Sequence, residues 1–289
     1  MKLYYKYKMD FKEAMILDNY LRAEKALFAF NIWDINSAKA VMDAASNEKR
    51  NVILQTSASL YRKLSQRQLR EFVNSYEAEC GVKAWLHLDH CRELEIIWDA
   101  IGNGWDSVMI DASDKPIGEN IRITNQVTER AHEEGVLVET EIGQVQGCED
   151  EVEVRNAAVA STDDIDRFLA ETSTDMLAVA FGNAHGIYQG EPILHYELVE
   201  YTVQHTDIPF VVHGGSGMSD EVIRRLLTIQ GVKKINISTE LKIAYQRGIE
   251  EAIKQGMLEM ESVQPVKVEE TIHNSIRKLV REKLQLLNI

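Results

Sequence analysis

The stretch Ala84-Trp85-Leu86-His87-Leu88-Asp89-His90 is a short apolar run that ends in a carboxylate and an imidazole. A run of this length, bounded by polar sequence, is typical of a buried β-strand. Alternation along a strand predicts that His87 and Asp89 share one face and that His90 lies on the other. A strand that delivers these groups to its carboxyl end suits a metal ligand beside a proton-transfer group.

Seven further apolar runs follow the same pattern, and each is followed by a segment of helical period or by a loop. The eight runs are Ala26–Ile32, Asn51–Ser57, Ala84–His90, Ser107–Ala112, Leu137–Gly143, Met176–Asn183, Pro209–Gly214 and Lys233–Ser238. Amphipathic segments between them include Ser37–Ser46, Ser65–Cys80, Ile121–Glu134, Thr162–Glu171, His195–His205 and Ser219–Ile229. Eight alternations of this kind predict a closed parallel (β/α)8 barrel, with a doubly wound open sheet as the alternative.

The barrel accounts for most of the chain. Residues Met9 to Leu21 predict a helix before the first strand, and Thr271 to Leu287 predict a terminal helix with an apolar stripe. No Pro-, Gly- or Ser-rich linker divides the 289 residues. We therefore expect one catalytic domain over residues 1–289, with extra helices at both ends.

Composition excludes several classes of partner. The 46 acidic and 32 basic residues give a net charge of −14, and no basic stripe offsets it, so neither nucleic acid nor an anionic membrane is an expected partner. The three cysteines lack metal-knuckle spacing, and the first residues lack the apolar core of a signal peptide. A reducing cytoplasm is the expected location.

Three histidines end apolar runs: His90, His185 and His213. The carboxyl ends of all strands in such a barrel open onto one mouth, where the active sites lie. Any one of these histidines would suit a structural role, but the three together resemble a catalytic zinc site with one open coordination position. The sequence therefore predicts a metallo-enzyme.

The ends of the seventh and eighth runs carry residues suited to an anion. They read His213-Gly214-Gly215-Ser216-Gly217 and Asn236-Ile237-Ser238-Thr239. Glycines let backbone N–H groups converge, Ser216 and Thr239 add hydroxyls, and a helix beginning near Thr239 adds its dipole. This is the usual phosphate position of the fold.

Six ordered motifs connect the chain to a known family. They are His87-Leu88-Asp89-His90, Ser107-Val108-Met109-Ile110-Asp111-Ala112-Ser113, Val138-Glu139-Thr140-Glu141-Ile142-Gly143, Phe181-Gly182-Asn183-Ala184-His185-Gly186-Ile187-Tyr188, His213-Gly214-Gly215-Ser216-Gly217 and Asn236-Ile237-Ser238-Thr239-Glu240-Leu241. On these motifs the chain resembles the class II, zinc-dependent ketose-bisphosphate aldolases, which include fructose-bisphosphate and tagatose-bisphosphate aldolases. The resemblance implies reversible cleavage of a ketose 1-phosphate or ketose 1,6-bisphosphate to dihydroxyacetone phosphate and an aldehyde.

The resemblance also implies roles for individual residues. His90, His185 and His213 would hold Zn2+, and a monovalent cation is a further candidate ion. Asp89 would take the C4 hydroxyl proton during cleavage, and Glu149, on a mobile loop, would transfer the proton at C3. The carboxylates Asp111 and Glu141 would bind the metal in an alternate position or orient the histidines by hydrogen bonds. Residues implied in substrate or phosphate binding are Ser57, Gly186, Gly214, Gly215, Ser216, Asn236, Ser238 and Thr239.

Departures from the family concern the substrate. Gln189 stands where many relatives have a lysine that binds the donor phosphate, and Met260 aligns with an arginine that binds the distal phosphate. Ser238 is closer to the tagatose-type residue than to the aspartate of fructose-type enzymes. These differences favour a substrate with a tagatose-like or noncanonical acceptor part over fructose 1,6-bisphosphate.

We expect a small phosphorylated sugar as the binding partner. We also expect the protein to form a homo-oligomer, either a dimer or a tetramer. Two alternatives stay open at this point. A barrel metallo-enzyme could isomerise or hydrolyse a phosphorylated sugar with the same histidines, and a non-catalytic paralogue could serve as a binding subunit.

Overall fold

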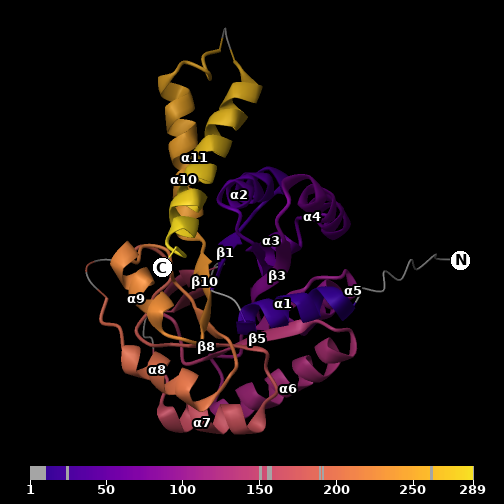
Figure 1. The fold of residues 1–289 in the computed structure, drawn as a ribbon, viewed down its shortest axis with the longest axis vertical. Helices are drawn as coiled ribbons and strands as arrows, with labels where there is room; N and C mark the ends of the chain where they lie inside the picture. The colour runs from indigo at the N-terminus through magenta and orange to yellow at the C-terminus, as the bar shows by residue number, and fades with distance from the viewer. Residues whose placement is uncertain are drawn as a thin grey trace, which may run out of the picture.

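The computed structural model describes residues 11–23, 26–149, 152–154, 158–188, 190, 192–260 and 263–288. Eight parallel strands form a closed barrel in the order β1-β10-β9-β8-β5-β4-β3-β2 (Figure 1). The strands are β1 Leu27–Asn31, β2 Val52–Ser57, β3 Ala84–Cys91, β4 Ser107–Ile110, β5 Leu137–Ile142, β8 Met176–Val179, β9 Phe210–Val212 and β10 Val232–Ile237. The predicted (β/α)8 barrel is confirmed, and the open sheet is excluded because β1 pairs with both β2 and β10.

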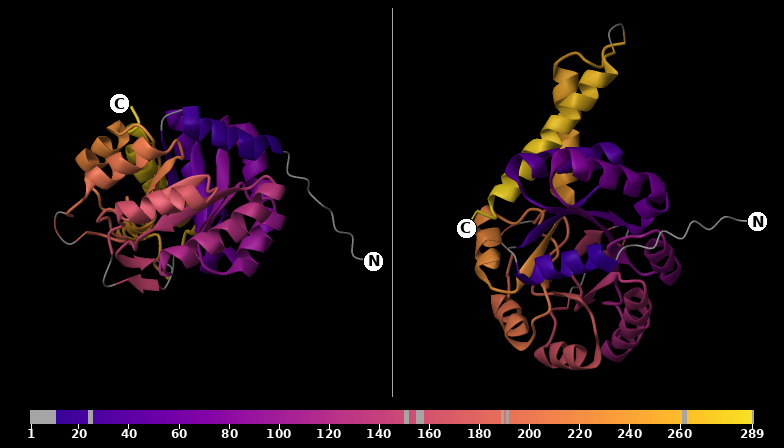
Figure 2. Two further views of the ribbon diagram at one scale, coloured as in Figure 1. Left: turned by 90° about the horizontal axis from the view of Figure 1, so that it is seen from below. Right: turned by 45° about the vertical axis from the view of Figure 1, so that its right-hand side comes forward.

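Helices surround the barrel, as the amphipathic segments predict (Figure 2). They are α2 Ile35–Glu48, α3 Ala58–Tyr61, α4 Gln66–Cys80, α5 Leu94–Gly102, α6 Ile117–Glu133, α7 Thr162–Glu171, α8 Tyr196–His205, α9 Asp220–Thr228 and α10 Thr239–Lys254. Side-chain caps mark the starts of α2, α7 and α9. In α2, for example, the Asp34 carboxylate accepts a hydrogen bond from the Ser37 N–H at 2.7 Å. The Ser37 hydroxyl oxygen accepts one from the Asp34 N–H at 3.0 Å, and the two bonds form a capping box.

An additional helix, α1 (Phe11–Ala23), closes the amino end of the barrel. Its buried Leu17 and Leu21 pack with Leu27, Trp85 and Met176 in one apolar cluster. The predicted helix over Met9–Leu21 is therefore present, although Met9 lies outside the described residues. Because α1 covers this end, the mouth of the barrel lies at the carboxyl ends of the strands.

The last two helices form an arm that projects from the barrel (Figures 1 and 2). The second of them, α11 (Pro265–Gln285), begins six residues before the predicted segment, with Pro265 in its first turn, where the missing N–H costs nothing. The two helices approach closely at Gly248, where a Cβ would lie 2.5 Å from the Ile272 Cα atom. The apolar stripe of α11 therefore packs within the chain near its base.

Two short strands between β5 and α7 were not predicted. The strands β6 (Gly147–Glu149) and β7 (Val152–Val154) form an antiparallel hairpin. None of the helices described is long and apolar enough to cross a bilayer. Because the terminal residues lie outside the described ranges, a single domain over 1–289 stays a prediction.

Candidate active site

Three histidines meet at the mouth of the barrel. His90 lies near the end of β3, His185 follows β8, and His213 follows β9 directly. One ligand atom of each lies within 4.8 Å of the others. The ring centres are 4.5 Å apart for His90 and His213, and 4.9 Å apart for His90 and His185. The structure thus brings together the three residues that the sequence proposes as metal ligands, and three imidazoles are a typical ligand set for catalytic zinc.

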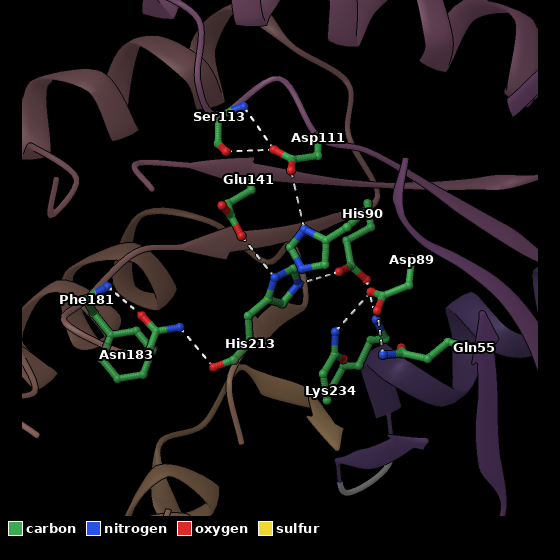
Figure 3. Close-up of polar contacts among 12 residues, drawn as sticks. Gln55, Asp89, His90, Asp111, Ser113, Glu141, Phe181, Asn183, His213 and Lys234 are labelled. Carbon is green, nitrogen blue, oxygen red and sulfur yellow. Dashed lines mark hydrogen bonds and ion pairs between the residues drawn. The ribbon is translucent and has the colours of Figure 1, made fainter. Parts of the chain in front are cut away.

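An irregular backbone aims His90 into this cluster. The pairing of β3 with β4 shifts register between Leu88 and Cys91, and His90 has a φ of 44° in the left-handed region. Strict alternation would turn His90 away from the face that carries Asp89. The bulge instead directs the imidazole toward His213 and Asp111 (Figure 3). A strained residue of this kind is common at functional sites.

A buried ion pair holds His213. Its Nε2 atom lies 2.8 Å from Glu139 Oε1, and the Lys234 ammonium donates to Glu139 Oε2 at 2.7 Å, with all three side chains fully buried. Because Nε2 is engaged by Glu139, Nδ1 is the ring atom left to face the site. Sequence reasoning missed Glu139 and Lys234, although a charged residue within an apolar strand was the available signal.

The other ring atom of His213 meets a second carboxylate. Nδ1 lies 2.9 Å from Glu141 Oε2, but both buried atoms lack a partner with hydrogen-bond geometry. Burial and His90 lower the pKa of His213, but Glu139 and Glu141 outweigh them and raise it to about 9. A buried nitrogen and a buried carboxylate oxygen that face one another without a hydrogen bond fit a bound cation.

Asp111 stands beside His90. Its Oδ2 atom lies 3.4 Å from His90 Nδ1 and accepts a hydrogen bond from Arg92 Nη2 at 3.0 Å (Figure 3). Burial opposes ionisation, but His90, Arg92 and the Ser113 hydroxyl hold the pKa of Asp111 well below its ordinary value. The carboxylate is therefore charged, and it can orient the His90 ring or bind the ion itself.

Asp89 is fully buried, one residue before His90. Its Oδ2 atom accepts hydrogen bonds from Asn31 Nδ2 at 2.8 Å and Gln55 Nε2 at 3.0 Å, and its Oδ1 atom accepts one from Asn236 Nδ2 at 3.3 Å. Three amide donors, from β1, β2 and β10, fix the orientation of the carboxylate. Sequence reasoning missed two of these donors, Asn31 and Gln55.

His87, Asp89 and Glu139 form a second group of three buried potential ligands within 4.8 Å. A cation already neutralises this group, since the Lys234 ammonium lies 2.7 Å from Glu139. Burial and then Lys234 hold the pKa of His87 well below its ordinary value, so its ring is neutral. Lys234 therefore fills the role that a second metal ion would have.

A small cavity beside His185 contains most of the predicted phosphate residues. It is lined by His185, Gly186, Gly214, Ser216, Asn236, Ser238, Thr239 and Lys242. Gly214 is required there, because its φ is +66° and a Cβ would lie 2.1 Å from the Ala184 carbonyl oxygen. The buried Ser216 hydroxyl accepts hydrogen bonds from the Ser238 and Glu240 N–H groups at 3.0 and 3.3 Å, which joins the ends of β9 and β10.

Other predicted residues lie elsewhere. Gly215 does not line the cavity but packs against β10, where a Cβ would lie 2.7 Å from the Asn236 carbonyl oxygen. Ser57 ends β2 in register with Asp89. The backbone of Glu149 belongs to β6, while its side chain and all of Gln189 lie outside the described structure. Met260 is 98% exposed in the connection between α10 and α11, on the projecting arm rather than at the mouth.

Fold and site together define a (β/α)8-barrel enzyme with a candidate metal centre at its carboxyl-end mouth. The chain belongs to the class II fructose-bisphosphate aldolase family, whose model matches residues 12–289, and it is a class II aldolase. Membership in this family favours a lyase over the isomerase, the hydrolase and the non-catalytic paralogue.

Relatives in the family carry more than one name. A fructose-bisphosphate aldolase of Geobacillus stearothermophilus is 38% identical over 243 residues, which cover 82% of this chain and 84% of the relative. A 6-phospho-5-dehydro-2-deoxy-D-gluconate aldolase of Bacillus subtilis (strain 168) is 39% identical over 233 residues, or 80% of each chain. The YdjI aldolase of Escherichia coli K12, known from its crystal structure, has a TM-score of 0.78 at 28% identity and covers 96% of this chain and 95% of its own. The fructose-bisphosphate aldolase of Campylobacter jejuni shares the fold, with a TM-score of 0.74 at 23% identity over 96% and 95% of the chains.

Proposed function

We propose that this protein is a zinc-dependent aldolase that reversibly cleaves a ketose 1-phosphate or ketose 1,6-bisphosphate to dihydroxyacetone phosphate and an aldehyde. One observation carries the proposal. Three imidazoles, a buried carboxylate and a cavity with phosphate-binding character share one barrel mouth. A metal-dependent aldolase would use these groups to polarise the ketose carbonyl, to accept the C4 hydroxyl proton and to bind the phosphate ester.

The metal would be held by His90, His185 and His213, with Asp111 and Glu141 orienting two of the rings or taking part in binding. When bound, Zn2+ would supply Lewis-acid polarisation of the substrate carbonyl. The Glu139–Lys234 pair would keep Nδ1 of His213 directed at the ion.

Asp89 would act as the general base in cleavage and the general acid in condensation. Its carboxylate takes the proton of the C4 hydroxyl as the C3–C4 bond breaks and returns it in the reverse reaction. The three amides around it hold the carboxylate in place through both states, so little reorganisation accompanies proton transfer.

The relatives agree less on the aldehyde part of the substrate than on the reaction. The relatives at 38% and 39% identity are named for different substrates, a fructose bisphosphate and a phosphorylated deoxyketogluconate. The second of these names describes a single phosphate and a carboxylate. Because Met260 is uncharged and aligns with the arginine that binds the distal phosphate in many relatives, we propose a substrate whose distal end is uncharged or is not a phosphate.

A panel of ketose phosphates tests this proposal. We expect dihydroxyacetone phosphate to be released from at least one member, with kcat/KM about ten- to a hundredfold higher for a monophosphate than for fructose 1,6-bisphosphate. The factor corresponds to one missing charge-assisted contact. Coupled detection of dihydroxyacetone phosphate gives the rates, and a strong preference for the bisphosphate would show that a distal cation is present.

Glu149→Gln tests the second proton transfer. The glutamine cannot accept a proton, so hydrogen exchange at C3 of dihydroxyacetone phosphate, measured without any aldehyde, should slow by about 10²-fold or more. Glu153→Gln, on the partner strand β7, is the matched control and should leave exchange unchanged. Normal exchange in the Glu149 variant would remove this residue from the mechanism without touching the aldolase assignment.

We also propose a homo-oligomer, dimer or tetramer. The support is the projecting arm, which exposes apolar side chains near its tip at Leu258, Met260, Val263 and Val266. Exposed apolar groups gathered in this way usually mark an interface. Light scattering, which gives the mass in solution, tests it.

A further inference from the structure

Lys242 is a cation at the phosphate cavity. Neither the sequence motifs nor the similarity to known aldolases gives this residue a role. We propose that Lys242 binds the phosphate monoester of the substrate, a role that rests on the proposed aldolase function. Lys242 is an exposed residue at the edge of the cavity beside His185, which it lines together with Ser216 and Thr239.

The position of Lys242 on α10 explains why its side chain reaches the cavity. It lies in the second turn of the helix, four residues after Ser238 and three after Thr239, and both of these also line the cavity. Residues three and four apart share a helix face, and helical side chains point back over the preceding turn. Helix geometry therefore directs the Lys242 side chain toward the amino end of α10, on the side of these two cavity residues.

Among the described residues, no acidic side chain is paired with this ammonium group. Within the part of the chain that the structure describes, Lys242 makes no hydrogen bond or ion pair. The one acid of the first turn, Glu240, is 2.8 Å from Lys283. The next residues on the same face, Tyr245 and Gln246, carry no charge.

A lysine near a helix amino end is electrostatically unfavourable by itself. The partial positive charge of the helix terminus repels it and at the same time attracts anions. A bound phosphate dianion would turn this repulsion into two attractions, one with the helix terminus and one with Lys242. This charge is also needed because the chain as a whole carries −14.

A second, independent feature indicates a ligand in the cavity. Asn236 is 6% exposed, and its Oδ1 atom has no hydrogen-bond partner although it is buried. Its amide nitrogen donates a hydrogen bond to Asp89 Oδ1 at 3.3 Å, and the amide oxygen is left as an acceptor for a ligand. A hydroxyl group of the sugar would satisfy it, which matches a phosphate ester that also carries hydroxyls.

The need for a cation such as Lys242 follows from Gln189, which differs from the residue that many family members have at this position. The resemblance places a donor-phosphate lysine at that position, and this chain has glutamine there. Lys242 would supply the missing charge from a different element, the helix after β10 instead of the loop after β8. The donor phosphate would thus keep one cation.

Lys242→Gln in the zinc-loaded enzyme tests the proposal. KM for the phosphorylated substrate and the inhibition constant of inorganic phosphate should both rise about ten- to a hundredfold, with kcat changed much less. Lys242→Arg should retain most of the affinity, because the charge is kept. Lys254→Gln, at the other end of α10, is the matched control and should leave both constants unchanged.

Two further measurements separate this proposal from the aldolase assignment. Condensation with unphosphorylated dihydroxyacetone should be equally slow in wild type and Lys242→Gln, because no phosphate is present to lose a contact. Calorimetric titration of inorganic phosphate requires no turnover, so it reports the role of Lys242 even if no ketose phosphate is cleaved. Unchanged phosphate affinity in Lys242→Gln would overturn the proposal.

Discussion

Asp89→Asn should lower kcat for cleavage by about 10²- to 10⁴-fold while the zinc content of the protein stays at its wild-type level. The substitution keeps the size of the side chain but removes the group that accepts the C4 hydroxyl proton. Asp89 lies next to the proposed ligand His90 in sequence, and the side-chain amides of Asn31 and Gln55 hold its carboxylate. Loss of rate without loss of metal is therefore the signature of a proton-transfer residue.

The measurement is steady-state release of dihydroxyacetone phosphate together with elemental analysis of the same preparation. Asp114→Asn, which changes a half-buried acid paired with Lys115, is the control and should leave kcat within a factor of about two. If Asp89→Asn keeps a near-normal kcat, the proton must be taken by another group. If it loses zinc instead, Asp89 supports the metal site and its role as base is not needed.

His213→Ala should remove most of the zinc and, with it, at least as much activity as the Asp89 variant loses. His213 is the most deeply held of the three imidazoles, since it is fully buried and fixed by Glu139 at 2.8 Å. Two remaining histidines are too few for a stable catalytic site, which normally has three protein ligands. Truncation also removes the contact of the His213 ring with Glu139 Oε1.

Zinc content after gel filtration, measured beside the circular dichroism spectrum, distinguishes loss of metal from loss of fold. His205→Ala changes an exposed histidine at the end of α8 and serves as the control. A folded His213→Ala protein that retains one zinc per chain would contradict the assignment of this ligand.

The strands of the barrel could be predicted because a strand buried on both sides is nearly continuous in apolar residues. The apolar runs at Ala84 and Met176 begin where β3 and β8 begin. The location of the active site could be predicted from the topology alone, since parallel strands place all their carboxyl ends together at one mouth of the barrel. This is why three histidines separated by up to 123 positions could be assigned to one site, from His90 to His213.

Other features depend on contacts that no local pattern encodes. The left-handed backbone at His90 contradicts simple alternation, because a bulge between two strands creates it. Glu139 and Lys234 look like ordinary charged residues until the closed barrel places them 2.7 Å apart. Lys242 follows directly after a family motif that ends at Leu241, and the cavity shows which residues lie beside it. The projecting arm was likewise invisible, since an amphipathic helix has the same pattern whether it lies on the barrel or extends from it.

The most direct test of the central claim is release of dihydroxyacetone phosphate from a ketose phosphate, measured on one preparation as isolated, after exhaustive chelation, and after zinc is restored. We expect about one zinc per chain and activity at first, near-complete loss of both after chelation, and recovery of both together. Activity that survives in protein shown by elemental analysis to be free of metal would contradict the account.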